Sequence, residues 1–350
     1  ADSRTATSRF YQMDLVRYYL ALSVIVAHFN IVFGYDVGWP TSSGSAVGIF
    51  FGFSGFLVYA SYLHHADLKG YVMSRAKRIL PAYSFVVIAC ALLLSLLSTL
   101  SLRDYFLNAA FWKYLVANLT FLNFLQPELP GVFGDNHLSA VNGSLWTLKV
   151  EWMLYLSIPL FCYVLRRTKA KPLVVVLLLF LLSLVYNNTL EYYSALTGNE
   201  TYYKLSYQFA GQFVYFYTGV LFYIYKDHFL THKTLYFSIG VLLLLADRAM
   251  VSTSEAMVVL WFHEIVYPIA SVTVFLVVSV SKFLSPKVTI LGNCSYEMYL
   301  FHFPILQTLA CSAAFTSLPI PVMLATSIVL TFVLAFVVNR LSLLLTRKKA

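Results

Sequence analysis

Three ionisable side chains, His28, Glu151 and His302, lie inside long apolar stretches of the sequence. An ionisable group within a membrane-spanning helix is costly, so each of them is a candidate for function. Histidine and glutamate are among the side chains that most often move protons in catalysis. The three residues therefore predict proton-transfer chemistry, and the structural alternative is a set of separate hydrogen bonds between helices.

A second group of residues is positively charged. Arg17 lies eleven residues before His28, and on a helix this spacing returns to within about 20° of the same face with a rise of about 16 Å. Asp14, three residues before Arg17, is placed to pair with it. Arg75 and Arg78 belong to a basic cluster further along. Such cations predict a site for a polyanion, such as the phosphates of a nucleotide-like donor. The alternatives are a snorkelling arginine and ordinary anchoring at the membrane surface.

The elements that position these residues are helices in a membrane. Hydrophobic residues make up 60% of the chain and charged residues 11%, with a mean hydropathy of +0.75. A soluble domain carries roughly a quarter charged residues, so lipid must cover much of this surface. Ten segments fit the hydropathy of spanning helices, which need roughly 20 predominantly apolar residues. They are residues 11–30, 46–63, 79–100, 144–165, 172–188, 207–225, 235–247, 257–281, 288–310 and 321–344.

Positive charge is distributed asymmetrically about these segments. With the N-terminus inside, 18 of the 24 lysines and arginines fall at the cytoplasmic side. The positive-inside rule therefore places both termini in the cytoplasm. The net charge of +9 is then a topology signal and does not indicate nucleic-acid binding. We expect a polar segment 1–10, a single transmembrane domain 11–344 and a basic cytoplasmic tail 345–350.

The longest outer segment covers residues 101–143. Its semi-apolar stretch Phe106–Leu125 favours a re-entrant or interfacial helix over a full span. An eleventh crossing would put the basic segment 166–171 outside, against the charge bias. The expected fold is therefore an all-α integral membrane protein with about ten transmembrane helices.

Glu151 and His302 are expected at the same depth as His28. Counted from Leu15, Leu165 and Val288, near the cytoplasmic ends of their spans, His28, Glu151 and His302 lie thirteen or fourteen positions in, which is roughly 20 Å. This predicts a shared polar cavity near mid-membrane, although equal depth alone does not require contact. Small residues at 48, 52 and 55 indicate either close helix approach or passage of a slim substrate chain.

The four cysteines all lie in apolar segments, without the spacing typical of metal or redox sites. We expect them to be buried small hydrophobic residues, and we expect no metal site and no tightly bound cofactor.

Five stretches of the chain resemble the membrane acyltransferase-3 family, the bacterial O-acyltransferases that modify surface polysaccharides. They are Asp14-Leu-Val-Arg17 followed by His28, Phe50-Phe-Gly-Phe-Ser-Gly-Phe-Leu57, Arg75-Ala-Lys-Arg-Ile-Leu-Pro-Ala-Tyr83, Trp146-Thr-Leu-Lys-Val-Glu151 with Tyr155, and Leu291-Gly-Asn-Cys-Ser-Tyr-Glu-Met-Tyr-Leu-Phe-His302. The matches are in order and cover nearly the whole chain. Thr147 stands where the family usually has Ser, and Trp152 where many members have a second acidic residue.

The resemblance implies acyl-CoA, commonly acetyl-CoA, as a cytoplasmic co-substrate and a sugar hydroxyl as the acceptor outside. The partners expected are therefore acyl-CoA, an extracytoplasmic glycan or glycolipid and the lipid bilayer of a bacterial inner membrane, with no nucleic acid. On this basis His28 and Glu151 are the expected catalytic residues, with His28 acting as general base or transient acyl carrier. The expected donor-binding residues are Arg17, Arg75, Arg78, Ser54 and Tyr83, and the supporting residues are Asp14, Trp146, Tyr155, Tyr296, Tyr299 and His302.

Three other functions fit the same sequence. A transporter or flippase would export an acyl or sugar group without forming a bond. A non-catalytic scaffold or sensor would tolerate alanine at Arg17 or His28. An acyltransferase could also modify a lipid in place of a sugar. Consumption of acetyl-CoA with release of the free CoA thiol separates the enzymes from the transporter.

Overall fold

The computed structural model describes residues 11–65, 67–253, 257–281 and 293–347. Every regular element in these ranges is a helix, and they contain no strand. Within the described residues, eight helices are long and apolar enough to cross a membrane. These findings confirm an all-α integral membrane protein, while the count of ten crossings and the cytoplasmic termini stay predictions.

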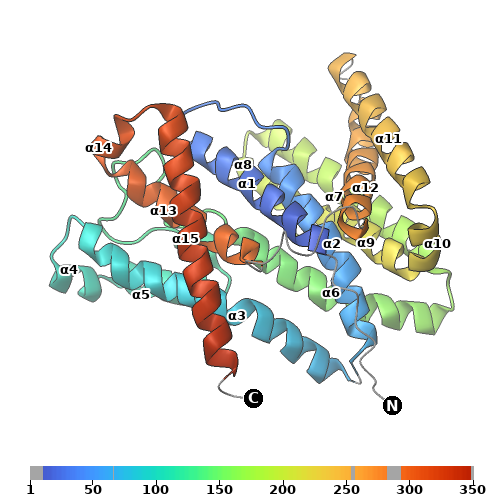
Figure 1. Cartoon of the computed structure of the whole chain (residues 1–350), viewed down its shortest axis with the longest axis horizontal. Helices are drawn as coiled ribbons and strands as arrows, with labels where there is room; N and C mark the ends of the chain where they lie inside the picture. The colour runs from blue at the N-terminus through green and yellow to red at the C-terminus, as the bar shows by residue number, and fades with distance from the viewer. Residues whose placement is uncertain (1–10, 66, 254–256, 282–292, 348–350) are drawn as a thin grey trace. The chain divides into compact units, whose positions relative to one another are not determined.

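The eight candidate spans belong to the longest helices. These helices are α1 (Tyr11–Phe33), α2 (Ser43–Leu63), α3 (Leu68–Leu93, continued by η1, Leu94–Leu97), α6 (Trp146–Thr168), α7 (Pro172–Thr197), α11 (Lys233–Thr253), α12 (Met257–Val280) and α15 (Ile320–Arg347). The shorter helices are α4 (Leu102–Leu107), α5 (Ala109–Leu119), η2 (Asn123–Leu125), α8 (Glu200–Ser206), η3 (Phe209–Gln212), α9 (Phe213–Ile224), α10 (Lys226–Thr231), α13 (Ser295–Ala310) and α14 (Ala313–Thr316). Figure 1 shows them along the chain.

Two predicted spans correspond to shorter helices. The segment 207–225 forms η3 and α9, and the segment 288–310 forms α13, with residues 288–292 outside the described ranges. The predicted span at 79–100 begins earlier than expected, because α3 starts at Leu68 and Pro81 lies inside it. The predicted span 79–100 put Pro81 in its first turn, where proline is tolerated. A prediction from hydropathy ends a span where charged residues begin, whereas helix α3 continues through the basic cluster.

The predicted helix at Phe106–Leu125 is broken into α4, α5 and η2. The side chain of Asn108 caps α5 by accepting a hydrogen bond from the Ala110 amide. An eleven-residue helix is about 16 Å long, so α5 is too short to cross a bilayer.

The chain forms two compact units, each assembled from separate stretches. Unit 1 contains residues 1–18, 47–71 and 150–292, and unit 2 contains residues 19–46, 72–149 and 293–350. Within unit 1, α11 and α12 run side by side as an antiparallel pair (Figure 1).

In unit 1, α2 packs closely against α9. A methyl group on Gly55 would lie 2.0 Å from the carbonyl oxygen of Phe216, and one on Gly219 would lie 1.8 Å from the carbonyl oxygen of Gly52. Only a residue without a side chain allows backbones to come this close. Small residues of the second span therefore serve close helix approach, which is one of the two roles expected from the sequence.

A proline inside α6 is matched by a hydrogen bond from a neighbouring helix of unit 1. Pro159 has no N–H, so the carbonyl of Tyr155, four residues earlier, loses its helical donor. The hydroxyl of Tyr71, which is fully buried, donates to this carbonyl at 2.7 Å. The bond fastens α3 to α6 at the point where the proline would leave a buried acceptor unpaired.

The same arrangement occurs in unit 2 around α13. Pro304 frees the carbonyl of Leu300, and the side-chain amide of Asn142 donates to it at 2.9 Å. One turn further along, the buried amide of Gln307 donates to the carbonyl oxygens of Leu138 and Ala140, at 2.6 and 2.7 Å. These bonds fix the segment before α6 along one side of α13.

Candidate functional site

Two histidines that lie 274 positions apart in the sequence meet within unit 2. His28 Nδ1, on α1, lies 2.7 Å from His302 Nε2, on α13. The ring planes are 16° apart and their centroids 5.0 Å apart. Because the nitrogens are much closer than the centroids, the rings meet at their edges. The contact confirms the part of the depth prediction that concerns these two residues.

Apolar side chains of unit 2 pack beside the pair. The Phe303 ring stands edge-on to His28, with centroids 5.1 Å apart. Phe29 and Leu306 beside it are fully buried. His302 is 0% exposed, whereas His28 is only partly buried. His28 is therefore the member of the pair that a substrate can reach.

The helix that carries His302 is held by residues from two of the resembling segments. The Tyr299 hydroxyl lies 2.8 Å from Thr147 Oγ1 and also donates to the Ser144 carbonyl at 3.3 Å. Tyr296 donates to the carbonyl of Ile79, on α3, at 3.3 Å. Tyr296 and Tyr299 thus fasten α13 to the elements on either side of it. Trp146 is partly buried at the start of α6.

Glu151 belongs to unit 1, where it forms a cluster with two hydroxyl groups. Its Oε1 accepts a hydrogen bond from Ser54, on α2, at 3.1 Å, and another from Tyr155, one turn along α6. Ser54 and Tyr155 therefore orient one carboxylate oxygen. The shared cavity expected for Glu151 and the two histidines stays a prediction, because the residues belong to different units.

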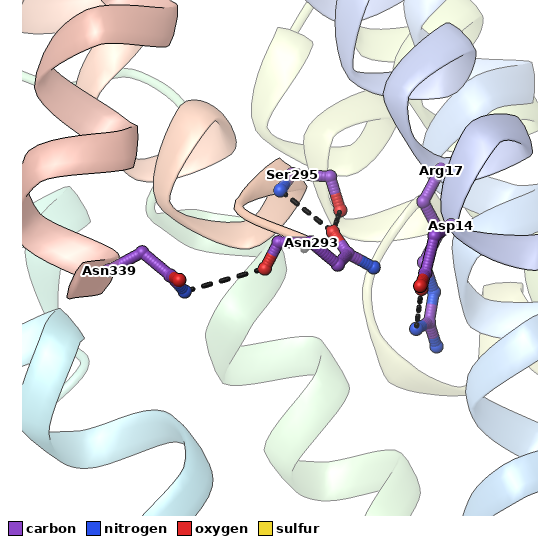
Figure 2. Close-up of polar contacts among 5 residues, drawn as sticks. All are labelled: Asp14, Arg17, Asn293, Ser295 and Asn339. Carbon is purple, nitrogen blue, oxygen red and sulfur yellow. Dashed lines mark hydrogen bonds and ion pairs between the residues drawn. The ribbon is translucent and has the colours of Figure 1, made fainter. Parts of the chain in front are cut away.

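The predicted donor-binding arginines lie in both units. In unit 1, Arg17 points along α1 to Asp14, with Nη1 4.0 Å from Oδ1 (Figure 2). In unit 2, Arg75 Nη2 donates to Ser74 Oγ at 2.9 Å. Arg75 Nε is buried and has no hydrogen-bond partner among the described residues. A buried donor of this kind is suited to an anionic ligand.

Arg78 lies at the surface, and Glu297, on α13, interacts with it electrostatically. Glu297 Oε1 accepts a hydrogen bond from Asn339, on α15, at 2.8 Å. The side chain of Asn339 also points to the backbone carbonyl of Asn293. The side-chain oxygen of Asn293 in turn accepts two hydrogen bonds, from the backbone amide and the hydroxyl of Ser295 (Figure 2). The sequence pattern gives no indication of a role for Glu297, because the segment matches the family motif through its tyrosines and His302.

Tyr83, predicted to bind the donor, is fully buried. Its hydroxyl donates to the Asn118 carbonyl at 2.6 Å, and its ring stacks on Phe121 with centroids 4.4 Å apart. In this structure it connects α3 with α5 and leaves no surface for a ligand. Within the described ranges, no group of three histidine, cysteine or acidic side chains is arranged to hold a metal ion.

The long apolar helices define the class of integral membrane proteins. Residues 10–340 match the acyltransferase-3 family, which is described as an acyltransferase domain. The chain therefore belongs to this family, and the resemblance carried by the five sequence segments is confirmed.

Two characterised relatives are similar over part of their length. One is an O-acetyl transferase of Shigella phage Sf6, 30% identical over 179 residues, which are 49% of this chain and 51% of the relative. The other is Nodulation protein 10 of Rhizobium leguminosarum bv. viciae, 31% identical over 180 residues, 47% of each chain. The chain thus spans about half the length of the curated relatives it matches. No solved structure matches it.

Proposed function

We propose that this protein transfers an acyl group, with acetyl as the first candidate, from cytoplasmic acyl-CoA to a hydroxyl of an extracytoplasmic sugar or polysaccharide. The observation that carries the proposal is the histidine pair in a chain of an acyltransferase family. His28 keeps some exposed surface, while the fully buried His302 holds its Nδ1. A histidine with one nitrogen held and part of its ring accessible is suited to act as a general base.

The proposed catalytic residues are a base for the acceptor hydroxyl and a carboxylate. His28 is the base. Glu151 is the second catalytic residue, and the hydrogen bonds from Ser54 and Tyr155 support this role because they hold its carboxylate in one orientation. Holding catalytic groups in place before the reaction lowers the barrier by avoiding reorganisation.

The proposed donor-binding residues are Arg17 in unit 1 and Arg75 and Arg78 in unit 2. Arginine side chains bind phosphate with two parallel hydrogen bonds, which suits the phosphates of acyl-CoA. The buried Nε of Arg75 has no hydrogen-bond partner among the described residues. This supports a role of Arg75 in phosphate binding, in addition to the positive charge typical of cytoplasmic segments. The predicted topology puts all three residues at the cytoplasmic side, where acyl-CoA is available.

An acceptor outside the membrane is supported by exposed aromatic side chains in the predicted outer segments. They include Trp39, Trp112, Tyr192, Tyr193 and Tyr203. Such rings stack on sugars and also form the aromatic belts of membrane proteins. The name of the phage relative, O-acetyl transferase, supports acetyl transfer to oxygen. A bacterial inner membrane is the location proposed for this reaction.

The test is a transfer assay on purified protein in nanodiscs. Acetyl-CoA and a panel of oligosaccharides are added, and release of the free CoA thiol is measured together with the acceptor mass. Replacing His28 with Gln keeps a polar side chain of similar size, and we expect it to lower turnover by about 10²–10⁴-fold while acetyl-CoA still binds. His64→Gln is the matched control, because His64 is exposed and bonded only to the backbone of its own helix.

Two results would count against the proposal. A protein that moves acetyl or sugar groups across the nanodisc without releasing thiol is a transporter. If His28→Gln turns over at nearly the rate of the wild type, His28 is not the catalytic base. A mass shift on a lipid in place of an oligosaccharide would retain the enzyme class and change the acceptor.

A further inference from the structure

The hydrogen bonds around His302 allow one arrangement of protons in the neutral pair. His302 Nδ1 lies 2.8 Å from the carbonyl oxygen of Tyr299. A carbonyl oxygen only accepts, so Nδ1 carries a proton. A neutral imidazole has one N–H, and therefore His302 Nε2 is an acceptor. His28 Nδ1, 2.7 Å away, must be the donor. The lone pair of His28 then lies on Nε2.

The difference in burial separates the roles of the two rings. His302 is 0% exposed, so no substrate touches it in this structure. His28 is partly exposed, and no described residue forms a hydrogen bond with its Nε2. An unpaired charge buried among apolar side chains is costly, so the neutral pair is the resting form. The nitrogen with the lone pair is thus on the ring that can reach a substrate.

We propose that His302 is the positioning residue for His28: it fixes the Nδ1–H tautomer, so that Nε2 is the atom that accepts the proton of the acceptor hydroxyl. The inference rests on the proposed acyl transfer and adds to it the atom that acts as base and the residue that selects this atom. Without His302, His28 would be free to carry its proton on Nε2, where it blocks the base.

The proton and bond changes balance without another reagent. The acceptor oxygen bonds to the carbonyl carbon of the thioester while its proton moves to His28 Nε2, and the carbon–sulfur bond breaks. The proton then passes to the thiolate of CoA, which leaves as the free thiol. His28 returns to its neutral Nδ1–H form. His302 remains the acceptor for Nδ1–H throughout, and this bond strengthens while His28 is positively charged.

The position of His302 is itself fixed from two sides. Thr147 holds the Tyr299 hydroxyl, and Asn142 holds the Leu300 carbonyl that Pro304 leaves free. Both contacts lie within one turn of His302 on α13. A displacement of about 1 Å of a catalytic group can cost about 10²-fold in rate, so a positioning residue requires this support.

Two substitutions at His302 separate the hydrogen bond from the space that the ring fills. Leu removes the acceptor, whereas Gln places an amide oxygen near the position of Nε2. We expect His302→Leu to lower kcat by about 10²–10³-fold, with KM for acetyl-CoA changed by less than about twofold. Removing the tautomer-fixing partner of the catalytic histidine in a serine protease costs about 10⁴, and a neutral partner should contribute less. His302→Gln should retain activity within about tenfold of the wild type.

A spectroscopic measurement tests the tautomer without relying on activity. Nitrogen NMR of ¹⁵N-histidine-labelled protein in nanodiscs distinguishes a protonated ring nitrogen from an unprotonated one, and the spectrum of His28→Gln identifies the His28 signals. We expect Nδ1 of His28 to be protonated in the wild type and in His302→Gln, and Nε2 to become protonated in a large share of His302→Leu. His64→Leu, which removes a similar bond from Nδ1 to a backbone carbonyl, should change neither the signals nor kcat.

The outcomes distinguish this inference from the proposed function. If the wild type releases thiol but His28 carries its proton on Nε2, the inference is wrong and the transfer stands. The same conclusion follows if His302→Leu keeps full activity. If the tautomer is as expected but no acceptor is acylated, the positioning role stands and the proposed reaction is wrong. If His302→Leu does not fold, the activity of His302→Gln and the wild-type spectrum still test whether His302 fixes the tautomer of His28.

Discussion

Removal of one hydroxyl group should lower stability at one fully buried tyrosine, Tyr71, and not at another, Tyr114. Tyr71→Phe deletes the donor to the Tyr155 carbonyl, which Pro159 deprives of its helical partner. Tyr114→Phe deletes a buried hydroxyl that has no hydrogen-bond partner among the described residues. The tyrosines are 0% and 1% exposed, so the two changes remove the same atom from equally buried sites.

The magnitudes follow from which group is left unpaired. In Tyr71→Phe a buried carbonyl loses its donor, and this costs about 1–3 kcal/mol. In Tyr114→Phe nothing is left unpaired. Burial raises the pKa of the Tyr114 hydroxyl well above its ordinary value, so the substitution removes no charge. We therefore expect Tyr114→Phe to lie within about 0.5 kcal/mol of the wild type or to be more stable.

A double-mutant cycle with Pro159→Ala tests the cause directly. Alanine restores an N–H at position 159, which can donate to the Tyr155 carbonyl within α6. In this background Tyr71→Phe should cost less, by about 1 kcal/mol. Unfolding is measured in mixed micelles as the SDS fraction rises, with tryptophan fluorescence as the signal. Equal costs for Tyr71→Phe in both backgrounds, or equal effects of the two Tyr→Phe changes, would refute the reasoning.

Two further substitutions test the helix contacts and the donor site. Gly55→Ala places a methyl group against a backbone carbonyl of α9, so it should lower stability by about 1–3 kcal/mol in a thermal melt. Gly44→Ala is the control, because a methyl group there has no atom within 4 Å. Equal melting temperatures of the two variants would contradict the close contact. Charge reversal at both Arg75 and Arg78 should weaken acetyl-CoA binding at least about tenfold by calorimetry, because contacts to phosphate are lost and repulsion is added. Charge reversal at the exposed Lys69 should not weaken acetyl-CoA binding. If the double variant is monodisperse and its affinity for acetyl-CoA is unchanged, the basic cluster only sets the topology.

Hydropathy and charge predicted the helices well because both reflect the solvent around a segment. The predicted spans 46–63 and 144–165 correspond to α2 and α6 within three residues at each end. The same reasoning failed at Pro81, since a helix does not end where its apolar face ends. It also put His28 and His302 at one depth, and they are in contact.

The partners of individual polar groups were beyond the sequence argument. Tyr83 matched a family motif, yet its hydroxyl is bonded to a carbonyl on α5, 35 residues away. Asn142 and Glu297 gave no signal of their own, because their roles depend on which helix packs beside them. A search for the carbonyl four residues before each proline would have identified Leu300 and Tyr155 as acceptors in need of a donor, although not the donors themselves.

The order of residues on α13 explains how a buried helix can hold a histidine without a charged partner. Pro304 stands two positions after His302 and frees the carbonyl of Leu300, two positions before it, for Asn142. The Tyr299 carbonyl, one position before Leu300, accepts the proton of His302 Nδ1. One external bond therefore fixes the backbone, and one internal bond fixes the ring. The bond from His302 Nδ1 to the Tyr299 carbonyl and the bond from His28 Nδ1 to His302 Nε2 follow one another in series. These two neutral hydrogen bonds orient His28, a task for which other enzymes use a buried carboxylate. They avoid placing a second charge among the apolar side chains beside His28.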